Sequence, residues 1–181
     1  VAACPKEQLI AHSAELLDTV AEALCDSSPL VRASGAEVFS TLLKPLGSVA
    51  INTVIPTLIS KIASTTAAIE GEQQGRSDDA DRALDGLKQV LHASGTRLLS
   101  IVIPRLLEDR PLTIASCRAL AASAAVAESE ITPYLTDIVD AMVLTIEAVD
   151  EDSSSESMAV KSLEELLGAV SSASNDSGHL L

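Results

Sequence analysis

The chain has 181 residues, enough for one domain or a short stack of repeats, and hydrophobic residues make up 47% of it. Aromatic residues account for only 1%, so the core must be built from Leu, Ile, Val and Ala, which favours packed helices over a β-sandwich. The 26 acidic and 12 basic residues give a formal charge of −14, which repels phosphate and argues against direct nucleic-acid binding.

The cysteines favour a cytoplasmic protein, and the first residues favour a fragment of a longer chain. Cys4, Cys25 and Cys117 are odd in number and lack metal-ligand spacing, which favours reduced, buried thiols over a disulfide framework or a metal site. No apolar run reaches the roughly 18 residues of a membrane span. Because the chain begins at Val1 without the basic region of a signal peptide, we expect it to be a fragment of a longer chain.

Helical spacing of apolar residues predicts two helices in the first 47 residues. The first covers residues 9–24 and is broken by Asp26-Ser27-Ser28-Pro29, where Ser28 is the expected N-cap and Pro29 the first helical residue. The second helix ends at Gly47. Residues 49–62 are apolar on most faces and predict a buried helix that starts or kinks at Pro56.

The remaining elements follow in the same way. Residues 64–80 form a polar loop with two glycines, followed by a helix that Gly95 closes. Further helices are expected at 98–107, at the Ala-rich 114–126, at 131–146 and, after the acidic, Ser-rich linker 151–157, at 158–170. The chain is therefore predicted to be all-α.

Two kinds of helix alternate along the chain, which is typical of a repeat protein. One kind is aliphatic throughout and contains a proline, as in VIPTLI (54–59), VIPRLL (102–107) and ITPYL (131–135). The other has a narrower apolar stripe and follows a polar turn. The unit length falls near the ~40–47 residues of two-helix repeats. We predict an α-solenoid of about four HEAT repeats, with approximate bounds 5–47, 48–95, 96–128 and 129–172.

The turn at residues 26–32 resembles the HEAT-repeat turn, in which Asp ends the first helix and Pro-x-Val-Arg begins the second. We interpret it as structural: Pro29 fixes the turn, Val31 packs inward, and Arg32 hydrogen-bonds Asp26 or a carboxylate of the neighbouring repeat. The alternative, that Arg32 contacts a ligand, stays open.

Three segments carry a resemblance to a family. VRASGAEVFSTLLKPLGSVAINTVIPTLI (31–59) and ALDGLKQVLHASGTRLLSIVIPRLL (83–107) resemble the general-control (Gcn-type) translational activators, and SNDSGHLL (174–181) is similar to a turn that precedes a further helix in that family. Residues 110–150 keep the register more weakly, and the loop at 64–79 departs from the shorter connection expected.

The resemblance implies a giant eukaryotic HEAT-repeat scaffold without chemistry of its own. Its members associate with ribosomes and help to activate the kinase of initiation factor 2α in amino-acid starvation or ribosome stalling. The implied partners are thus the ribosome and that kinase, with no membrane, no cofactor and no small-molecule substrate. A second hypothesis is an importin-like adaptor whose acidic face binds basic proteins.

Candidate sites for chemistry are sparse. His12, His92 and His179 are isolated; His92 lies near a helix end, where a capping or surface role is expected. The stretches GEQQG (71–75) and EAVDED (147–152) lack phosphate-loop and metal-site spacing, and Asn175-Asp176-Ser177 fits the glycosylation pattern by chance. These observations argue against a helical-bundle enzyme, so neither catalytic nor metal residues are predicted.

The linker 151–157 offers one regulatory hypothesis. Ser153, Ser154 and Ser155 stand among acidic residues before the last helix, where phosphate would interact favourably with the helix N-terminus. The alternative is a flexible polar loop.

Overall fold

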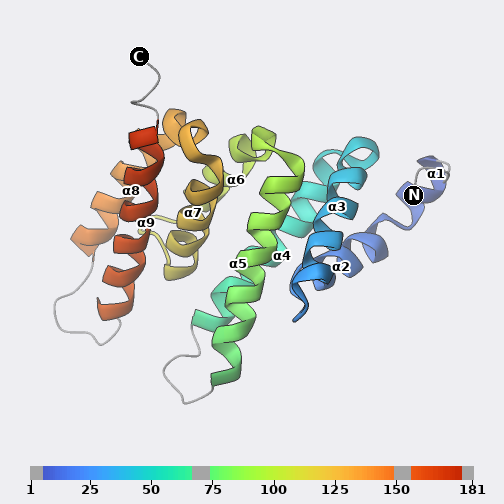
Figure 1. Ribbon diagram of the computed structural model, residues 1–181, viewed down its shortest axis with the longest axis horizontal. Coiled ribbons are helices and arrows are strands. Elements are labelled where there is room, and N and C mark those ends of the chain that lie inside the picture. Colours follow the sequence, from blue (N-terminus) through green and yellow to red (C-terminus); the bar gives the residue numbers. More distant parts are fainter. Residues whose placement is uncertain (1–5, 67–73, 149–155, 177–181) are drawn as a thin grey trace. The chain divides into compact units, whose positions relative to one another are not determined.

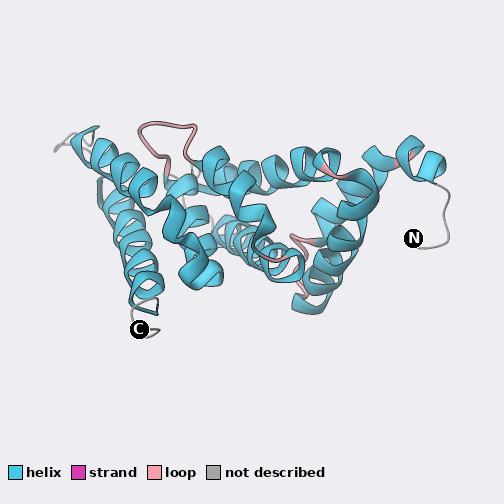
Figure 2. Cartoon of the chain, turned by 90° about the horizontal axis from the view of Figure 1, so that it is seen from above, coloured by secondary structure: helices cyan, strands magenta, loops and turns pink. Residues whose placement is uncertain are grey.

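A computed structural model describes residues 6–66, 74–148 and 156–176, and every regular element within these ranges is helical (Figures 1 and 2). This confirms the prediction of an all-α chain. The chain divides between Gly95 and Thr96 into two compact units, which are described separately below.

The first unit is built from two helical pairs. Its helices are α1 (Lys6–Ala11), α2 (Ser13–Ala23), α3 (Pro29–Leu46), α4 (Ser48–Thr66) and α5 (Gln74–Ser94). Within the pairs α2 packs against α3 and α4 against α5; between the pairs α2 packs against α4 and α3 against α5. The unit therefore has two layers, one of α2 and α4 and the other of α3 and α5 (Figure 1).

Aliphatic side chains and the single Phe fill the space between these layers. The largest fully buried side chains here are Phe39, Leu17, Leu24, Leu42, Ile55, Leu58, Ile62 and Leu87. Each such side chain contributes about 1.5–3 kcal/mol through removal from water. The apolar stripes of the sequence thus become the core of the unit.

A proline lies inside α4, whereas glycines with positive φ follow α3 and α5. Pro56 lies inside α4, which begins at Ser48, so the expectation that this helix starts at Pro56 is wrong. The helix tolerates the missing N–H because the unbonded carbonyl belongs to Asn52, a residue exposed to water. Gly47 and Gly95, with φ of 53° and 70°, follow α3 and α5 and confirm the predicted ends.

The second unit contains η1 (Thr96–Leu98), α6 (Leu99–Leu106), α7 (Ile114–Ala127), η2 (Glu128–Tyr134), α8 (Leu135–Ala148) and α9 (Glu156–Asp176). The Ala-rich α7 packs against α6, η2 and α9, and its small side chains permit this close contact on several sides. Thr113 caps α7 by accepting a hydrogen bond from Ser116 N at 3.1 Å.

A buried hydroxyl joins α8 to the loop before α7. Thr145 Oγ1 accepts a hydrogen bond from Leu112 N at 2.8 Å and donates one to Ala141 O at 2.7 Å. The backbone N–H of Leu112 is thereby satisfied in an apolar environment, where leaving it unpaired would be costly.

The loop expected over 64–80 is shorter than predicted. Helix α4 continues to Thr66 and α5 begins at Gln74, while residues 67–73 lie outside the described residues. The end of the polar stretch is helical. Arg82 pairs there with Asp79 at 2.8 Å and Asp78 at 4.0 Å, at the i,i+3 and i,i+4 spacings that add modest support to a helix. The division into four repeats stays a prediction.

Candidate functional site

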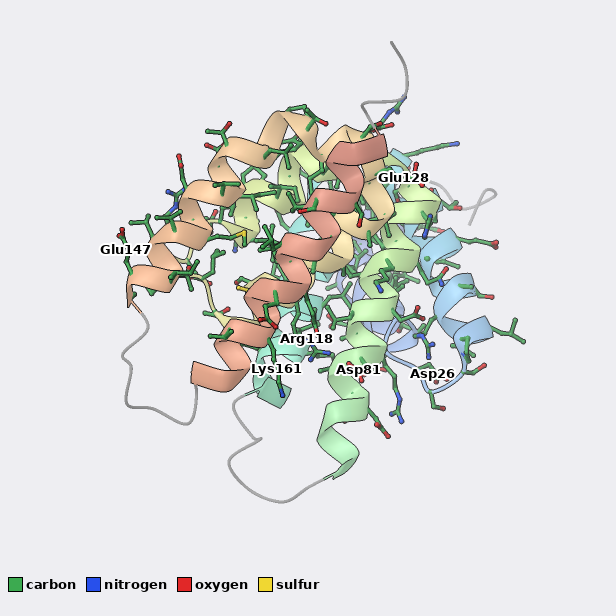
Figure 3. All side chains as sticks on the ribbon, turned by 60° about the vertical axis from the view of Figure 1, so that its left-hand side comes forward. Asp26, Asp81, Arg118, Glu128, Glu147 and Lys161 are labelled. Atoms are coloured by element: carbon green, nitrogen blue, oxygen red, sulfur yellow. The ribbon has the colours of Figure 1, made fainter. Side chains whose placement is uncertain are left out.

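The turn between α2 and α3 is closed by the side chain of Asp26, which Figure 3 shows on the loop that joins these helices. Its Oδ1 accepts a hydrogen bond from Ser28 N at 2.7 Å. Ser28 is the N-cap of α3 and Pro29 the first helical residue, as the sequence predicts, although the Ser28 side chain itself makes no capping hydrogen bond. The Asp26 carboxylate therefore fixes the backbone of the turn through its hydrogen bond with Ser28 N, although the Ser28 hydroxyl caps nothing.

Arg32 connects this turn to α5. Its Nε donates to Asp85 Oδ2 at 2.6 Å, and its Nη1 donates to the carbonyl oxygens of Asp26 at 2.7 Å and Ser27 at 3.2 Å. The residue is only 9% exposed. A buried guanidinium requires such partners, because an unpaired charge in this position would be strongly destabilising.

Val31 does not pack inward, so this part of the expectation for the turn is wrong. The residue is 40% exposed. The inward face of α3 is occupied instead by Arg32, Gly35, Ala36 and Phe39, which follow the i, i+3, i+4, i+7 spacing. Since neighbouring residues in a helix point about 100° apart, burial of Arg32 turns Val31 towards water.

Two glycines allow α3 and α5 to approach the end of α2. A Cβ at Gly35 would lie 3.2 Å from Ala23 Cβ and 3.4 Å from Leu24 N. A Cβ at Gly86 would collide with the carbonyl oxygen of Leu24 and lie 3.0 Å from its carbonyl carbon. Gly86 lies in the segment ALDGLKQV, and its close contact with the Leu24 backbone explains why a glycine occurs inside α5.

The contacts between α3 and α5 show that these helices run parallel. Arg32 pairs with Asp85 and Ser40 Oγ donates to Ala93 O at 3.1 Å, and both pairs are 53 residues apart. The sequence predicts Asp26 or a carboxylate of the neighbouring repeat as the partner of Arg32, and the structure contains both contacts. The 53-residue offset identifies that carboxylate as Asp85. Position 85 is thus the α5 counterpart of position 32 in α3.

A groove of about 490 Å³ lies between these parallel helices. We call it the α3–α5 groove. Its lining residues are Ala33, Ala36, Glu37, Ser40 and Thr41 of α3 and Gln89, His92 and Ala93 of α5. Small side chains line much of it, and polar side chains from both helices accompany them.

The two cysteines in the described residues, Cys25 and Cys117, form no disulfide. Burial raises the pKa of the Cys117 thiol to about 11. Desolvation also raises the pKa of Cys25, partly offset by the charge and hydrogen bond of Lys61. Neither thiol is therefore activated as a nucleophile. Cys4 lies outside the described residues.

Neither of the two described histidines belongs to a metal-binding cluster. His12 is the N-cap residue of α2, and its Nδ1 lies 3.8 Å from Oε2 of the exposed Glu15. His92 lies in the last turn of α5. His179 lies outside the described residues. Within the parts of the chain that are described, no group of three or more His, Cys, Asp or Glu side chains could hold a metal ion.

Other predicted stretches are described only in part. Residues 71–73 of GEQQG, 149–152 of EAVDED, Ser153–Ser155 of the linker and residues 177–181 at the end lie outside the described ranges. Gln74 begins α5, Glu147 is exposed near the end of α8, and Asn175 and Asp176 end α9. Among the described helices, none combines the length and hydropathy that crossing a bilayer requires.

Comparison with known proteins identifies the type of repeat. Residues 98–181 match the family of HEAT repeats described as stalled ribosome sensor GCN1-like. The chain is 30% identical over 138 residues to the eIF-2-alpha kinase activator GCN1 of Dictyostelium discoideum and 28% identical over 148 residues to that of Saccharomyces cerevisiae. It is 27% identical over 141 residues to the human stalled ribosome sensor GCN1.

These matches cover 76%, 82% and 78% of the chain, respectively, but each covers only 5% of the relative. No solved structure matches the chain. The helical pairs and these similarities together confirm the predicted resemblance of the chain to GCN1-like HEAT repeats.

Proposed function

We propose that the chain is a non-catalytic, cytoplasmic scaffold segment of a translational activator, which contacts ribosomes and promotes activation of the kinase of initiation factor 2α. The observation that carries this proposal is the similarity over about three quarters of the chain to relatives named as kinase activators and a stalled ribosome sensor. The chain spans 5% of each, so it would supply one part of that activity.

The architecture of the first unit supports a scaffold role. Helical pairs that stack through aliphatic faces leave long helix surfaces free for partners, and each pair contacts only its neighbours. The described polar contacts of this unit, such as Arg32–Asp85 and Arg82–Asp79, lie within and between its helices. The charge of −14 favours protein partners over direct contact with ribosomal RNA.

A chimera tests this proposal. The segment of the yeast relative that aligns with this chain would be replaced by the chain, with deletion of the segment and the unaltered yeast protein as controls. We expect the chimera to restore phosphorylation of initiation factor 2α during amino-acid starvation and to sediment with ribosomes, whereas the deletion does neither. A chimera that accumulates normally but behaves like the deletion would contradict the proposal.

The importin-like hypothesis rests on the same acidic charge but predicts a different outcome of the chimera experiment. It predicts that the isolated chain binds nuclear-import signal peptides with an affinity that falls steeply with salt, and that the chimera is inactive. Restoration of kinase activation by the chimera would exclude it as the main function.

A further inference from the structure

The α3–α5 groove contains polar side chains that lack a partner among the described residues. Among the described residues, no hydrogen bond or ion pair engages the carboxylate of Glu37, which is exposed, or the carboxamide of Gln89, which is half-buried. The hydroxyls of the groove are different, because Ser40 Oγ donates to Ala93 O and Thr41 Oγ1 to Glu37 O. The groove thus offers one carboxylate, one carboxamide and the imidazole of His92 to a ligand.

The three alanines of the lining favour small apolar groups. Ala33 and Ala36 of α3 and Ala93 of α5 leave room between two parallel helices. The space of about 490 Å³ lies within the range of roughly 300–1,000 Å³ that small-ligand pockets occupy. Such a space accommodates a short peptide segment with small side chains facing the alanines.

We propose that the α3–α5 groove binds an extended peptide segment of a partner protein, with a Lys or Arg side chain beside Glu37 and a small apolar side chain against Ala33 and Ala36. Gln89 can donate to a backbone carbonyl and accept from a backbone N–H, as an extended peptide requires. The proposal rests on the proposed scaffold function and adds a site and a partner chemistry to it.

Charge complementarity selects this occupant. Glu37 is the only carboxylate among the lining residues, and the chain carries a charge of −14, so an acidic peptide or a phosphate would be repelled. A second copy of this acidic chain is disfavoured for the same reason. A cationic side chain instead forms a charge-assisted hydrogen bond with the carboxylate.

Peptide libraries test the proposal with the whole chain. The probes are three pools of capped nonapeptides, random except for a central Lys, norleucine or Glu, and their binding is measured by fluorescence anisotropy at low and physiological salt. We expect preference for Lys over norleucine over Glu. Glu37→Gln should weaken binding of the Lys pool by about threefold to fivefold, because an ion pair at an exposed carboxylate contributes up to about 1 kcal/mol. Gln89→Ala should weaken all pools roughly threefold.

Two further variants make the result specific to the groove. Glu164→Gln removes one exposed carboxylate from α9 and should leave binding unchanged, while Ala33→Met fills the groove and should abolish binding with Glu37 intact. Circular dichroism confirms that each variant is folded. Three results would overturn the inference: equal losses of affinity in Glu37→Gln and Glu164→Gln, equal affinity for the Lys, norleucine and Glu pools, or no binding of any pool.

The chimera assay separates the two proposals. If a chimera of the wild-type chain activates the kinase while the isolated chain binds no peptide pool, the groove inference fails and the scaffold function stands. If the groove binds the Lys pool while the chimera is inactive, the site is real and the assigned function is wrong.

Discussion

Arg32 of α3 and Asp85 of α5 join the two helical pairs of the first unit, with Nε and Oδ2 2.6 Å apart. The same guanidinium also binds the carbonyl oxygens at the end of the α2–α3 turn. One side chain therefore holds a turn within the first pair and a helix of the second pair. Because the Arg32 side chain is 11% exposed and that of Asp85 36% exposed, the contact is shielded on one side only.

Removing Arg32 should destabilise the first unit more than removing its partner. We expect Arg32→Ala to lower the free energy of unfolding by about 2 kcal/mol, since Asp85 and two carbonyl groups lose their donor. Asp85→Asn should cost about 1 kcal/mol because the carbonyl contacts of Arg32 remain. Urea denaturation followed by circular dichroism measures both values.

A double-mutant cycle isolates the contact between the two side chains. The double variant Arg32→Ala/Asp85→Asn should cost less than the sum of the single changes. Strict additivity would show that Arg32 acts through the turn carbonyls alone.

Gly86 and Gly35 should respond differently to the same added methyl group. Gly86→Ala forces a collision with the backbone of Leu24, so we expect a loss of about 3 kcal/mol or failure to fold. At Gly35 the nearest atom is a side-chain Cβ at 3.2 Å, and the helix preference of alanine offsets the crowding, which leaves stability within about 1 kcal/mol. Thermal unfolding of both variants provides the comparison, and similar losses would contradict the assigned close approach at Gly86.

Gly47 and Glu128 end their helices in nearly the same backbone conformation. At Gly47, which follows α3, φ is 53° and ψ is −124°. At Glu128, which follows α7 and is labelled in Figure 3, φ is 47° and ψ is −125°. A residue with a Cβ is strained there. Glu128→Gly should raise the free energy of unfolding by about 1 kcal/mol, and Gly47→Ala should lower it by a similar amount, because no neighbouring atom obstructs a Cβ at Gly47.

Glu128→Ala serves as the control for this pair. It removes the side chain but keeps the strained backbone, and should therefore leave stability nearly unchanged. Equal stabilisation by Ala and Gly would attribute the effect to the glutamate side chain.

The buried thiol of Cys117 should resist modification until the protein unfolds. In a Cys4→Ser background at pH 8, we expect a disulfide reagent to modify Cys25 slowly and Cys117 only in denaturant, because burial raises both pKa values. Because the folded state favours the protonated Cys117 thiol, burial of this thiol contributes fully to the free energy of unfolding below pH 9. That contribution is lost as the pH rises through about 11. Cys117→Ser tests this, since it should flatten the decline of stability in that pH range.

Much of the helical organisation follows from local patterns in the sequence. Apolar residues at helical spacing predict the helices, Ser28-Pro29 predicts the start of α3, and Gly47 and Gly95 predict helix ends, since each signal acts on the chain nearby. The shortage of aromatic residues predicts an aliphatic helical core. The alternation of helix types, together with the family resemblance, predicts HEAT repeats.

Only the tertiary structure decides which distant residues meet. The 53-residue offset between α3 and α5 depends on the length of α4 and of the connection after it, and this offset selects Asp85 as the partner of Arg32. Burial of Arg32 in turn leaves Val31 exposed, and the close approach to Leu24 explains Gly86. The α3–α5 groove arises in the same way, because helical periodicity determines a side chain's direction within its own helix but not the neighbouring helix that it faces.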